Sequence, residues 1–264
     1  MRKYFEMFKV EFKINIAYRF QIWARLLGDI VFVAMWYFVW KALYGGADES
    51  QGILFSETVL YVVIAQFLIT INNAGSPLWD MDNNISSGNI AGELIKPYNF
   101  MAKTLTQCVS SSISIFLLSS LWVFTATFII LKVDVPTNIV TWIIFIISFI
   151  AGYLIRFFIE LSFSFLSFWV IHIGGIRALF TFSISVFSGS VVPLWFFPDK
   201  IRLIANILPF QYIYYVPCNI ISNHMGFGEC YKYILAQLLW VLLSILLAKF
   251  VWYKGSKELI IQGG

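Results

Sequence analysis

Several apolar runs in this chain are long enough to cross a lipid bilayer, and this property restricts the fold more than any other. A spanning helix needs about 18 or more predominantly apolar residues, and the runs over residues 26–44, 103–131 and 139–171 provide them. Only 12% of the residues are charged, against about 25% in soluble domains. Because the runs are continuous rather than alternating, helices are expected instead of barrel strands.

We therefore predict an all-α, polytopic membrane protein that forms a single transmembrane domain over residues 1–264. Six transmembrane helices are expected, at residues 26–44, 57–72, 103–131, 139–171, 178–192 and 233–253. Gly174 and Gly175 are expected to break the chain before the fifth of these helices, with Arg177 in the loop. Lys and Arg concentrate near both ends of the chain, which places both termini in the cytoplasm.

The first residues predict an amphipathic helix over residues 2–22. Its apolar side chains recur at helical spacing, at Phe5, Phe8, Phe12 and Ile16. Its charged side chains occupy a different face and comprise Arg2, Glu6, Lys9 and Lys13. This pattern is typical of a helix that lies in the membrane interface with its basic side toward the lipid head groups. The alternative is a soluble lead-in to the first span.

The stretch Trp79–Phe100 is the longest polar interruption between two apolar runs. It predicts a cytosolic loop with a short helix over residues 83–97, held between two membrane helices. Ser86 or Ser87 is expected to cap this helix and Pro97 to stop it. One apolar side is expected, formed by Ile90, Leu94 and Ile95. Two interpretations stay open, namely a contact for a soluble partner and an ordinary loop between helices.

Two sets of polar residues lie inside apolar runs. Arg156 and Glu160 are four residues apart and therefore share one face of a helix. They are interpreted either as part of a translocation path or as a structural ion pair, which is the cheapest way to bury both charges. The fifth run carries small polar residues that indicate either pore lining or close helix packing, namely Ser183, Ser185, Ser188, Gly189 and Ser190.

Catalytic and metal-binding motifs are absent from the sequence. There is no GxxxxGK[ST], HExxH or GxSxG pattern, so we expect no P-loop in this chain, no metal site and no enzymatic activity of its own. The net charge of +4 is ordinary for a membrane protein and predicts no nucleic-acid binding. Cys108 is expected to be a packing residue. Cys218 and Cys230 share one segment, and a disulfide between them stays open.

Two stretches resemble the permease subunits of ABC transporters of the type-2 exporter superfamily. The first is ISSGNIAGELIKPYNF, from Ile85 to Phe100. The second is FSGSVVPLWFFPDKIRLIANILPFQYIYYVP, from Phe187 to Pro217. The pair Phe168-Trp169 also resembles the branch of uncharacterised ABC permeases. The resemblance covers nearly the whole chain in order and spacing, and the second stretch is its more specific part.

The resemblance implies a role for each of three segments. Residues 2–22 would be the connecting helix along the inner membrane face. A coupling helix would contact a separate ATP-binding subunit through Ile85, Ser86, Ser87, Gly88, Ile90, Glu93, Leu94, Lys96 and Pro97. Extracellular re-entrant helices over residues 193–217 would gate the path, with Pro193, Pro198, Leu208, Pro209, Phe210 and Pro217.

The resemblance also implies an assembly. Two ATP-binding subunits, which bind ATP and Mg, would join this chain and a second permease, either a copy of it or a paralogue. The assembly would lie in the bacterial cell membrane and export a substrate such as a peptide, drug, lipid or glycan. Two alternatives stay open. One is an ion-coupled secondary carrier that uses Arg156 and Glu160, with Ser183 and Ser188 in the path. The other is a membrane enzyme that acts on lipid.

Overall fold

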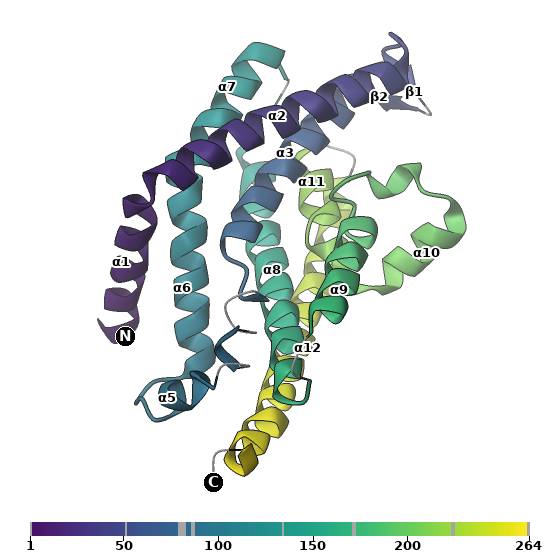
Figure 1. The fold of residues 1–264 in the computed structure, drawn as a ribbon. Helices are drawn as coiled ribbons and strands as arrows, with labels where there is room; N and C mark the ends of the chain where they lie inside the picture. Colours follow the sequence, from purple (N-terminus) through teal and green to yellow (C-terminus); the bar gives the residue numbers. More distant parts are fainter. Residues whose placement is uncertain are drawn as a thin grey trace.

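The computed structural model describes residues 2–50, 52–78, 83–85, 88–133, 135–170, 173–222 and 225–262, and these are almost entirely helical (Figure 1). Five helical stretches are long and apolar enough to cross a membrane, at Phe20–Tyr44, Phe55–Ala74, Phe100–Leu131, Ile139–Phe168 and Gly228–Glu258. They belong to α2 (Arg19–Tyr44), α3 (Phe55–Ala74), α6 (Phe100–Ile115) with α7 (Leu121–Leu131), α8 (Ile139–Ser164) and α12 (Phe227–Gln262). The all-α, polytopic prediction is confirmed, while the sixth apolar helix, α9 (Gly174–Phe187), is shorter.

Some helix boundaries differ from those predicted. The N-terminal helix α1 (Arg2–Ala17) ends at a break at Tyr18, so the last predicted residues of the 2–22 helix belong to α2. The fifth predicted span begins earlier and ends at Phe187. Gly174 and Gly175 start this helix and do not break it. Glycine is costly mainly in a helix interior, and the amides of a first turn lack intrahelical partners whatever the residue.

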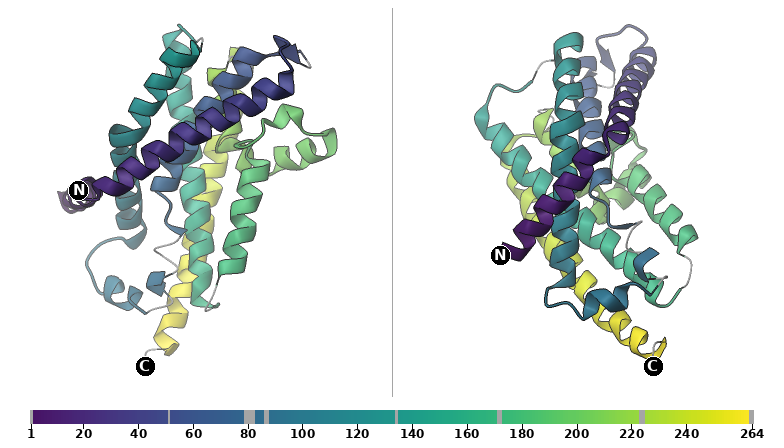
Figure 2. Two further views of the ribbon diagram at one scale, coloured as in Figure 1. Left: turned by 45° about the horizontal axis from the view of Figure 1, so that its top comes forward. Right: turned by 60° about the vertical axis from the view of Figure 1, so that its left-hand side comes forward.

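The centre of the bundle is α3. Most of its side chains are buried, and it packs against α2, α6 and the short helix α11 (Tyr215–Ile221). The largest buried cluster joins Tyr61 and Leu68 of α3 to Ile155 of α8 and Ile213 and Tyr214 near α11. The long helix α12 runs beside α8 (Figure 2). Gln237 of α12 fixes this contact, because its amide donates to the carbonyl oxygens of Ser148 and Tyr212 at 3.1 and 2.9 Å.

The C-terminal end of α3 stops well short of the N-terminal end of α6. The Ser112 hydroxyl of α6 donates to the Ile71 carbonyl in the last turn of α3, at 2.9 Å. A Cβ added to Gly75 would lie 2.6 Å from the Cys108 carbonyl oxygen. Ser112 is twelve residues after Phe100, so α6 continues for about 18 Å beyond this level. The chain after Gly75 therefore occupies a space that a longer α3 would fill.

The opposite end of the bundle holds a β-hairpin and several short helices (Figure 1). The hairpin pairs β1 (Glu49–Ser50) with β2 (Ile53–Leu54), with Glu49 opposite Leu54. The region over 193–217 contains η3 (Leu194–Phe196), α10 (Asp199–Ile207), η4 (Pro209–Tyr212) and the start of α11. The prolines of this region lie at or close to the first residues of its helices. Pro193 and Pro198 precede η3 and α10, Pro209 begins η4, and Pro217 lies in the first turn of α11.

Candidate functional site

The segment after α3 contains the short helix α5 (Ile90–Leu94), at the same end of the bundle as the end of α12 (Figure 1). Residues 83–85 are also helical, whereas Ser86 and Ser87, the predicted caps, lie outside the described residues. Gly88 adopts φ +75°, a left-handed conformation that glycine tolerates best. The backbone therefore turns sharply just before α5.

The apolar residues of this segment do not form the single face that was predicted. Ile85 and Ile90 are buried, while Leu94 is 42% exposed and Ile95 is 86% exposed. The reason is the spacing of these residues. Ile95 follows Ile90 by five residues, which is about 140° around an α-helix with 3.6 residues per turn, so it cannot share the Ile90 face. The segment thus has a buried apolar side and a separate exposed apolar tip, Leu94-Ile95.

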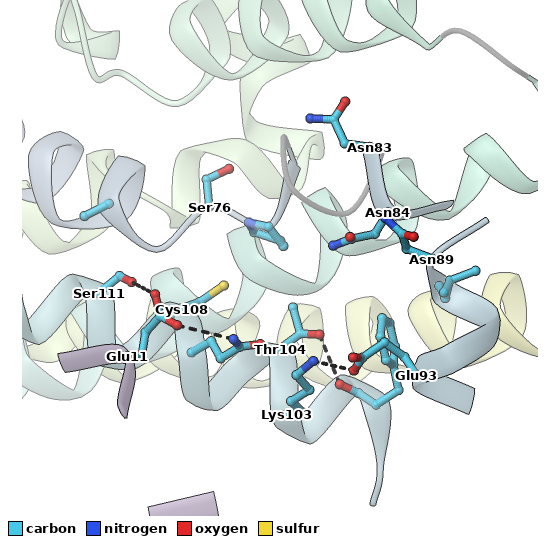
Figure 3. Close-up of a pocket in the computed structure, with 15 residues that line it drawn as sticks. Glu11, Ser76, Asn83, Asn84, Asn89, Glu93, Lys103, Thr104, Cys108 and Ser111 are labelled. Atoms are coloured by element: carbon cyan, nitrogen blue, oxygen red, sulfur yellow. Dashed lines mark hydrogen bonds and ion pairs between the residues drawn. The ribbon is translucent and has the colours of Figure 1, made fainter. Parts of the chain in front are cut away.

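Glu93 connects α5 to the start of α6. Its carboxylate accepts hydrogen bonds from Lys103, from Lys96 at 2.7 Å and from Tyr98 at 2.5 Å. Figure 3 shows Lys103 of α6 reaching toward Glu93. Partial burial raises the pKa of Glu93, but these three hydrogen bonds and the charge of Lys103 outweigh it and lower the pKa to about 2. Glu93 is therefore ionised and held in place at neutral pH.

The first turn of α1 holds the other side of the same segment. The Lys3 ammonium donates to the Pro97 carbonyl at 2.6 Å, and the Asn99 amide donates to the Tyr4 hydroxyl at 3.1 Å. Farther along, the Ser110 hydroxyl donates to the Phe8 carbonyl at 2.8 Å. These contacts run in the same order along both helices. The first half of α6 and α1 therefore lie side by side, pointing in the same direction.

The predicted apolar face of α1 is divided by this contact. Phe8 and Phe12 are half-buried and stack with ring centroids 6.2 Å apart, while Phe5 and Ile16 are exposed. The face toward α6 includes polar residues that the apolar pattern did not single out. Asn15 donates to the Ser111 hydroxyl at 3.2 Å, and Gln107 donates to the Glu11 carboxylate at 3.3 Å.

The buried side of the α5 segment inserts into an aromatic cluster. Ile85 and Ile90 pack there with Phe100 of α6 and with side chains of α8 and η2 (Phe165–Phe168), namely Phe157, Leu161, Phe165 and Phe168. Phe100 also stacks on Trp252 of α12, with ring centroids 4.8 Å apart and planes 10° apart. Displacing Ile90 would therefore disturb α6, α8 and α12 together, because close-packed side chains transmit strain.

A polar cavity of about 460 Å³ lies between the end of α3, the α5 segment, α1 and α6 (Figure 3). Its lining includes Glu11, Asn84, Asn89, Lys103 and Ser111. Few apolar side chains reach it, so it suits water or a polar group better than an apolar ligand. It lies directly behind the segment over 83–97 that was predicted to contact a partner.

Arg156 and Glu160 form a buried pair on α8. The Arg156 Nε lies 2.6 Å from the Glu160 Oε1. Arg156 also donates to the Tyr214 hydroxyl at 2.5 Å and to the Asn73 side-chain oxygen at 2.7 Å. The Ser76 hydroxyl donates to Glu160 at 2.7 Å. The pair therefore binds the end of α3 and the start of α11 to α8, and it does not line the polar cavity.

The small polar residues of the fifth run have local hydrogen-bond partners, except the Ser188 hydroxyl, which has none among the described residues. Ser183 and Ser185 donate to carbonyl oxygens of α9 itself. Gly189 takes φ +72°, and its carbonyl accepts from the Tyr61 hydroxyl at 2.7 Å. A Cβ at this position would lie 2.8 Å from that hydroxyl oxygen, so the glycine permits close contact with α3. Ser188, beside it, is buried.

The three cysteines are all free and buried, so Cys218 and Cys230 do not form a disulfide in this structure. Cys218 belongs to the main core, and Cys108 packs in the aromatic cluster. Among the described residues, no group of three or more His, Cys, Asp or Glu side chains is placed to hold a metal ion.

Asp29 is a buried acid that the sequence interpretation missed. It lies in α2, is 5% exposed, and accepts a hydrogen bond from the Thr70 hydroxyl at 2.7 Å. The sequence could have indicated this buried acid, because Asp29 follows Arg25 by four residues at the start of the first apolar run. Ionisable residues at such positions are rare and call for an explanation.

Comparison with known families supplies the identity. The chain matches the family described as "ABC-2 family transporter protein" over residues 30–263. No curated protein matches the chain significantly. The matched region begins inside α2, extends past the end of α12, and so includes the 83–97 segment, the Arg156–Glu160 pair and the short helices near residue 200. The resemblance noted in the sequence is thereby confirmed. The chain belongs to the ABC-2 family of transporter proteins and is a multi-pass membrane permease component of an ABC transporter.

Proposed function

We propose that this permease forms half of the translocation path of an ATP-driven exporter and that the segment over residues 83–97 receives the force of ATP hydrolysis. The observation that carries the proposal is the combination of a rigid base and an exposed apolar tip in one short polar segment. Two ATP-binding subunits, with their ATP and Mg, and a second permease complete the transporter. Peptides, drugs, lipids and glycans are all compatible substrates.

The base of the segment is suited to transmit force. Ile90 is held in the aromatic cluster, Glu93 is held by Lys103, Lys96 and Tyr98, and Pro97 is held by Lys3. A push on the segment therefore acts on α1, α6, α8 and α12 at once. A flexible loop would absorb the same displacement through its own backbone.

The tip is suited to contact a soluble protein. Leu94 and Ile95 are exposed next to Lys96 and Pro97, in the polar part of the chain between two apolar helices. Apolar side chains at the centre of an interface usually provide a large share of its binding energy. A groove in the ATP-binding subunit would bury the tip. Closure of the two ATP-binding subunits would then move the segment as a unit, and the two states would differ in these contacts.

The alternative of an ion-coupled carrier receives less support. Arg156 and Glu160 satisfy each other, and Tyr214, Asn73 and Ser76 occupy further hydrogen-bonding positions. A carrier site must exchange its ion with water, whereas Arg156 and Glu160 are buried and do not line the polar cavity themselves, although Ser76, which donates to Glu160, does. The geometry supports a structural role for the pair.

The test is co-purification of the ATP-binding subunit with the tagged permease. Ile95→Asp places a charge at the tip and should reduce the recovered subunit by about tenfold or more, the effect of roughly 1.4 kcal/mol. Val135→Asp is the matched control, because Val135 is an exposed apolar residue in the loop between α7 and α8. Undiminished recovery with Ile95→Asp, or export by the permease alone, would refute the proposal.

A further inference from the structure

We propose that Asp29 is a proton-binding site within the membrane-spanning part of the bundle, with Ser119 as the acceptor for the bound proton. The proposal does not depend on the coupling role of the 83–97 segment. It rests on two buried oxygen atoms, one on Asp29 and one on Ser119, that a single proton would satisfy.

The carboxyl group of Asp29 is only half satisfied. Its Oδ1 accepts from Thr70, but its Oδ2 is buried and has no hydrogen-bond partner of ordinary geometry among the described residues. The same is true of the Ser119 Oγ. The Ser119 hydroxyl and the Gln66 amide nevertheless lie close enough to act on this carboxyl group. Two polar atoms of neighbouring helices are therefore left without partners in the same place.

The position of Ser119 follows from an irregular turn. Between α6 and α7 the helix widens into a π-turn, η1 (Phe116–Ser120), which packs against both α2 and α3. A serine in an ordinary α-helix often donates to the carbonyl four residues earlier, as Ser114 does. Ser119 does not, so its hydroxyl is free for another partner. Single π-turns of this kind occur frequently at functional sites.

A proton bound to Asp29 would give both the Asp29 Oδ2 and the Ser119 Oγ a hydrogen-bond partner. A protonated carboxyl group has one O–H donor, whereas a carboxylate only accepts. The hydroxyl oxygen of Ser119 can accept that hydrogen while its own proton turns toward Gln66 or a backbone carbonyl. An ionised Asp29 would instead be a buried charge whose Oδ2 has no donor of ordinary geometry among the described residues, which is costly.

No ion pair neutralises Asp29 within the part of the chain that the structure describes. Arg25, four residues earlier on α2, is half-buried, and no ion pair joins it to Asp29 among the described residues. Its long side chain can extend toward the membrane surface. On α3 the one acid, Glu57, lies in the first turn, about 20 Å from Thr70, and Tyr61 lies nine residues from Thr70. The π-turn and α7 contain no titratable residue.

A proton fits this site better than a metal ion does. Hard cations take about six oxygen ligands, and one carboxylate with a few side-chain hydroxyl and amide groups falls short of that number. The hydroxyl hydrogen of Thr70 is already directed at the carboxylate. A proton needs one acceptor, and Ser119 supplies it.

Carbodiimide labelling tests the proposal on the whole chain in membrane vesicles. Dicyclohexylcarbodiimide adds to a protonated carboxyl group. The carboxyl proton goes to a carbodiimide nitrogen, the carboxyl oxygen bonds to the central carbon, and acyl transfer to nitrogen gives a stable acylurea with no leaving group. Mass spectrometry should find Asp29 modified, with less modification as the pH is raised. Glu160, which Arg156 neutralises, should stay unmodified.

Two variants complete the experiment. Ser119→Ala should shift the pH midpoint of labelling down by about one unit, the effect of losing one hydrogen bond of roughly 1.4 kcal/mol. Ser183→Ala is the control and should not shift it, because Ser183 bonds within α9. An unlabelled Asp29 at every pH, labelling independent of pH, or an unshifted midpoint with Ser119→Ala would overturn the proposal. Protection by sodium at constant pH would also overturn it, in favour of a metal cation.

Discussion

The guanidinium of Arg156 lies 2.6 Å from the carboxylate of Glu160, one turn later on α8, and each of the two also bonds to residues at the C-terminal end of α3. Through these bonds and the one from Arg156 to Tyr214, the pair connects α8 to the end of α3 and to the start of α11. It also provides a hydrogen-bond partner for the Asn73 side chain where α3 ends inside the bundle.

Arg156→Ala should therefore destabilise the permease strongly. Removing one member of a buried pair leaves the other charge uncompensated, which costs about 3–5 kcal/mol. Thermal unfolding in detergent measures the effect. Arg202→Ala is the control, because the Arg202–Asp199 pair is exposed and should contribute less than about 1 kcal/mol. Replacing both partners, by Arg156→Met with Glu160→Leu, should restore much of the loss. Equal unfolding temperatures for all variants would contradict the structural role.

Glu93→Arg should uncouple ATP hydrolysis from transport while the permease stays in the membrane. The substitution places a cation beside Lys103 and Lys96 and releases the base of α5. Gly88→Trp should act similarly, because a side chain at φ +75° strains the turn by about 1–2 kcal/mol. Transport and ATPase rates in vesicles give the comparison, with Glu49→Arg in the distant hairpin as the control. Full transport by both variants would show that the segment is not a coupling element.

The Glu93 interactions predict a particular pH dependence. An unperturbed glutamate has a pKa of about 4.3, and the pKa of Glu93 in the folded protein is lowered to about 2. Its stabilising effect is therefore fully present above about pH 4.3 and is lost as the pH falls toward 2. Unfolding temperatures of the natural chain and of Glu93→Gln should differ at neutral pH and converge in acid. A constant difference over this range would contradict the assignment.

Gly152→Ala should destabilise the contact between α8 and η4. A Cβ at Gly152 would lie 2.8 Å from the Tyr212 carbonyl oxygen and 2.9 Å from that of Ile213, which are backbone atoms and cannot rotate away. Overpacking of this kind typically costs about 1–3 kcal/mol. Gly28→Ala on α2 meets nothing within 4 Å and should be neutral or stabilising by up to about 1 kcal/mol. Equal unfolding temperatures for the two variants would argue against this packing.

Much of the fold was predictable because continuous apolar runs in lipid leave the backbone few choices. The positions of α2, α3, α6 with α7, and α8 follow from this constraint, and so does the position of the Arg156–Glu160 pair on one helix face. The helix boundaries were less predictable. Gly174 and Gly175 look like breakers in isolation, but they begin α9, because the cost of glycine depends on where in the helix it stands.

The partners of the candidate site could not be read from the sequence. Glu93 and Lys103 are ten residues apart with a turn between them, so periodicity gives no reason to pair them. Contacts between α1 and α6, such as Asn15 with Ser111, join residues nearly a hundred positions apart. Asp29 was missed for the opposite reason, since one acid does little to the average polarity of a long apolar run. Its importance depends on Thr70 and Ser119, which only the folded bundle brings near it.

The early end of α3 also affects the electrical properties of the permease. Because α6 extends about 18 Å beyond the level of Ser112, water in the polar cavity beside the end of α3 would thin the low-dielectric layer at this end of the bundle. A given membrane voltage would fall across this shorter distance, so the field there would be steeper than in the surrounding bilayer. Any charged group that crosses the remaining layer would encounter most of the potential difference away from the cavity, toward the end of the bundle that holds the β-hairpin.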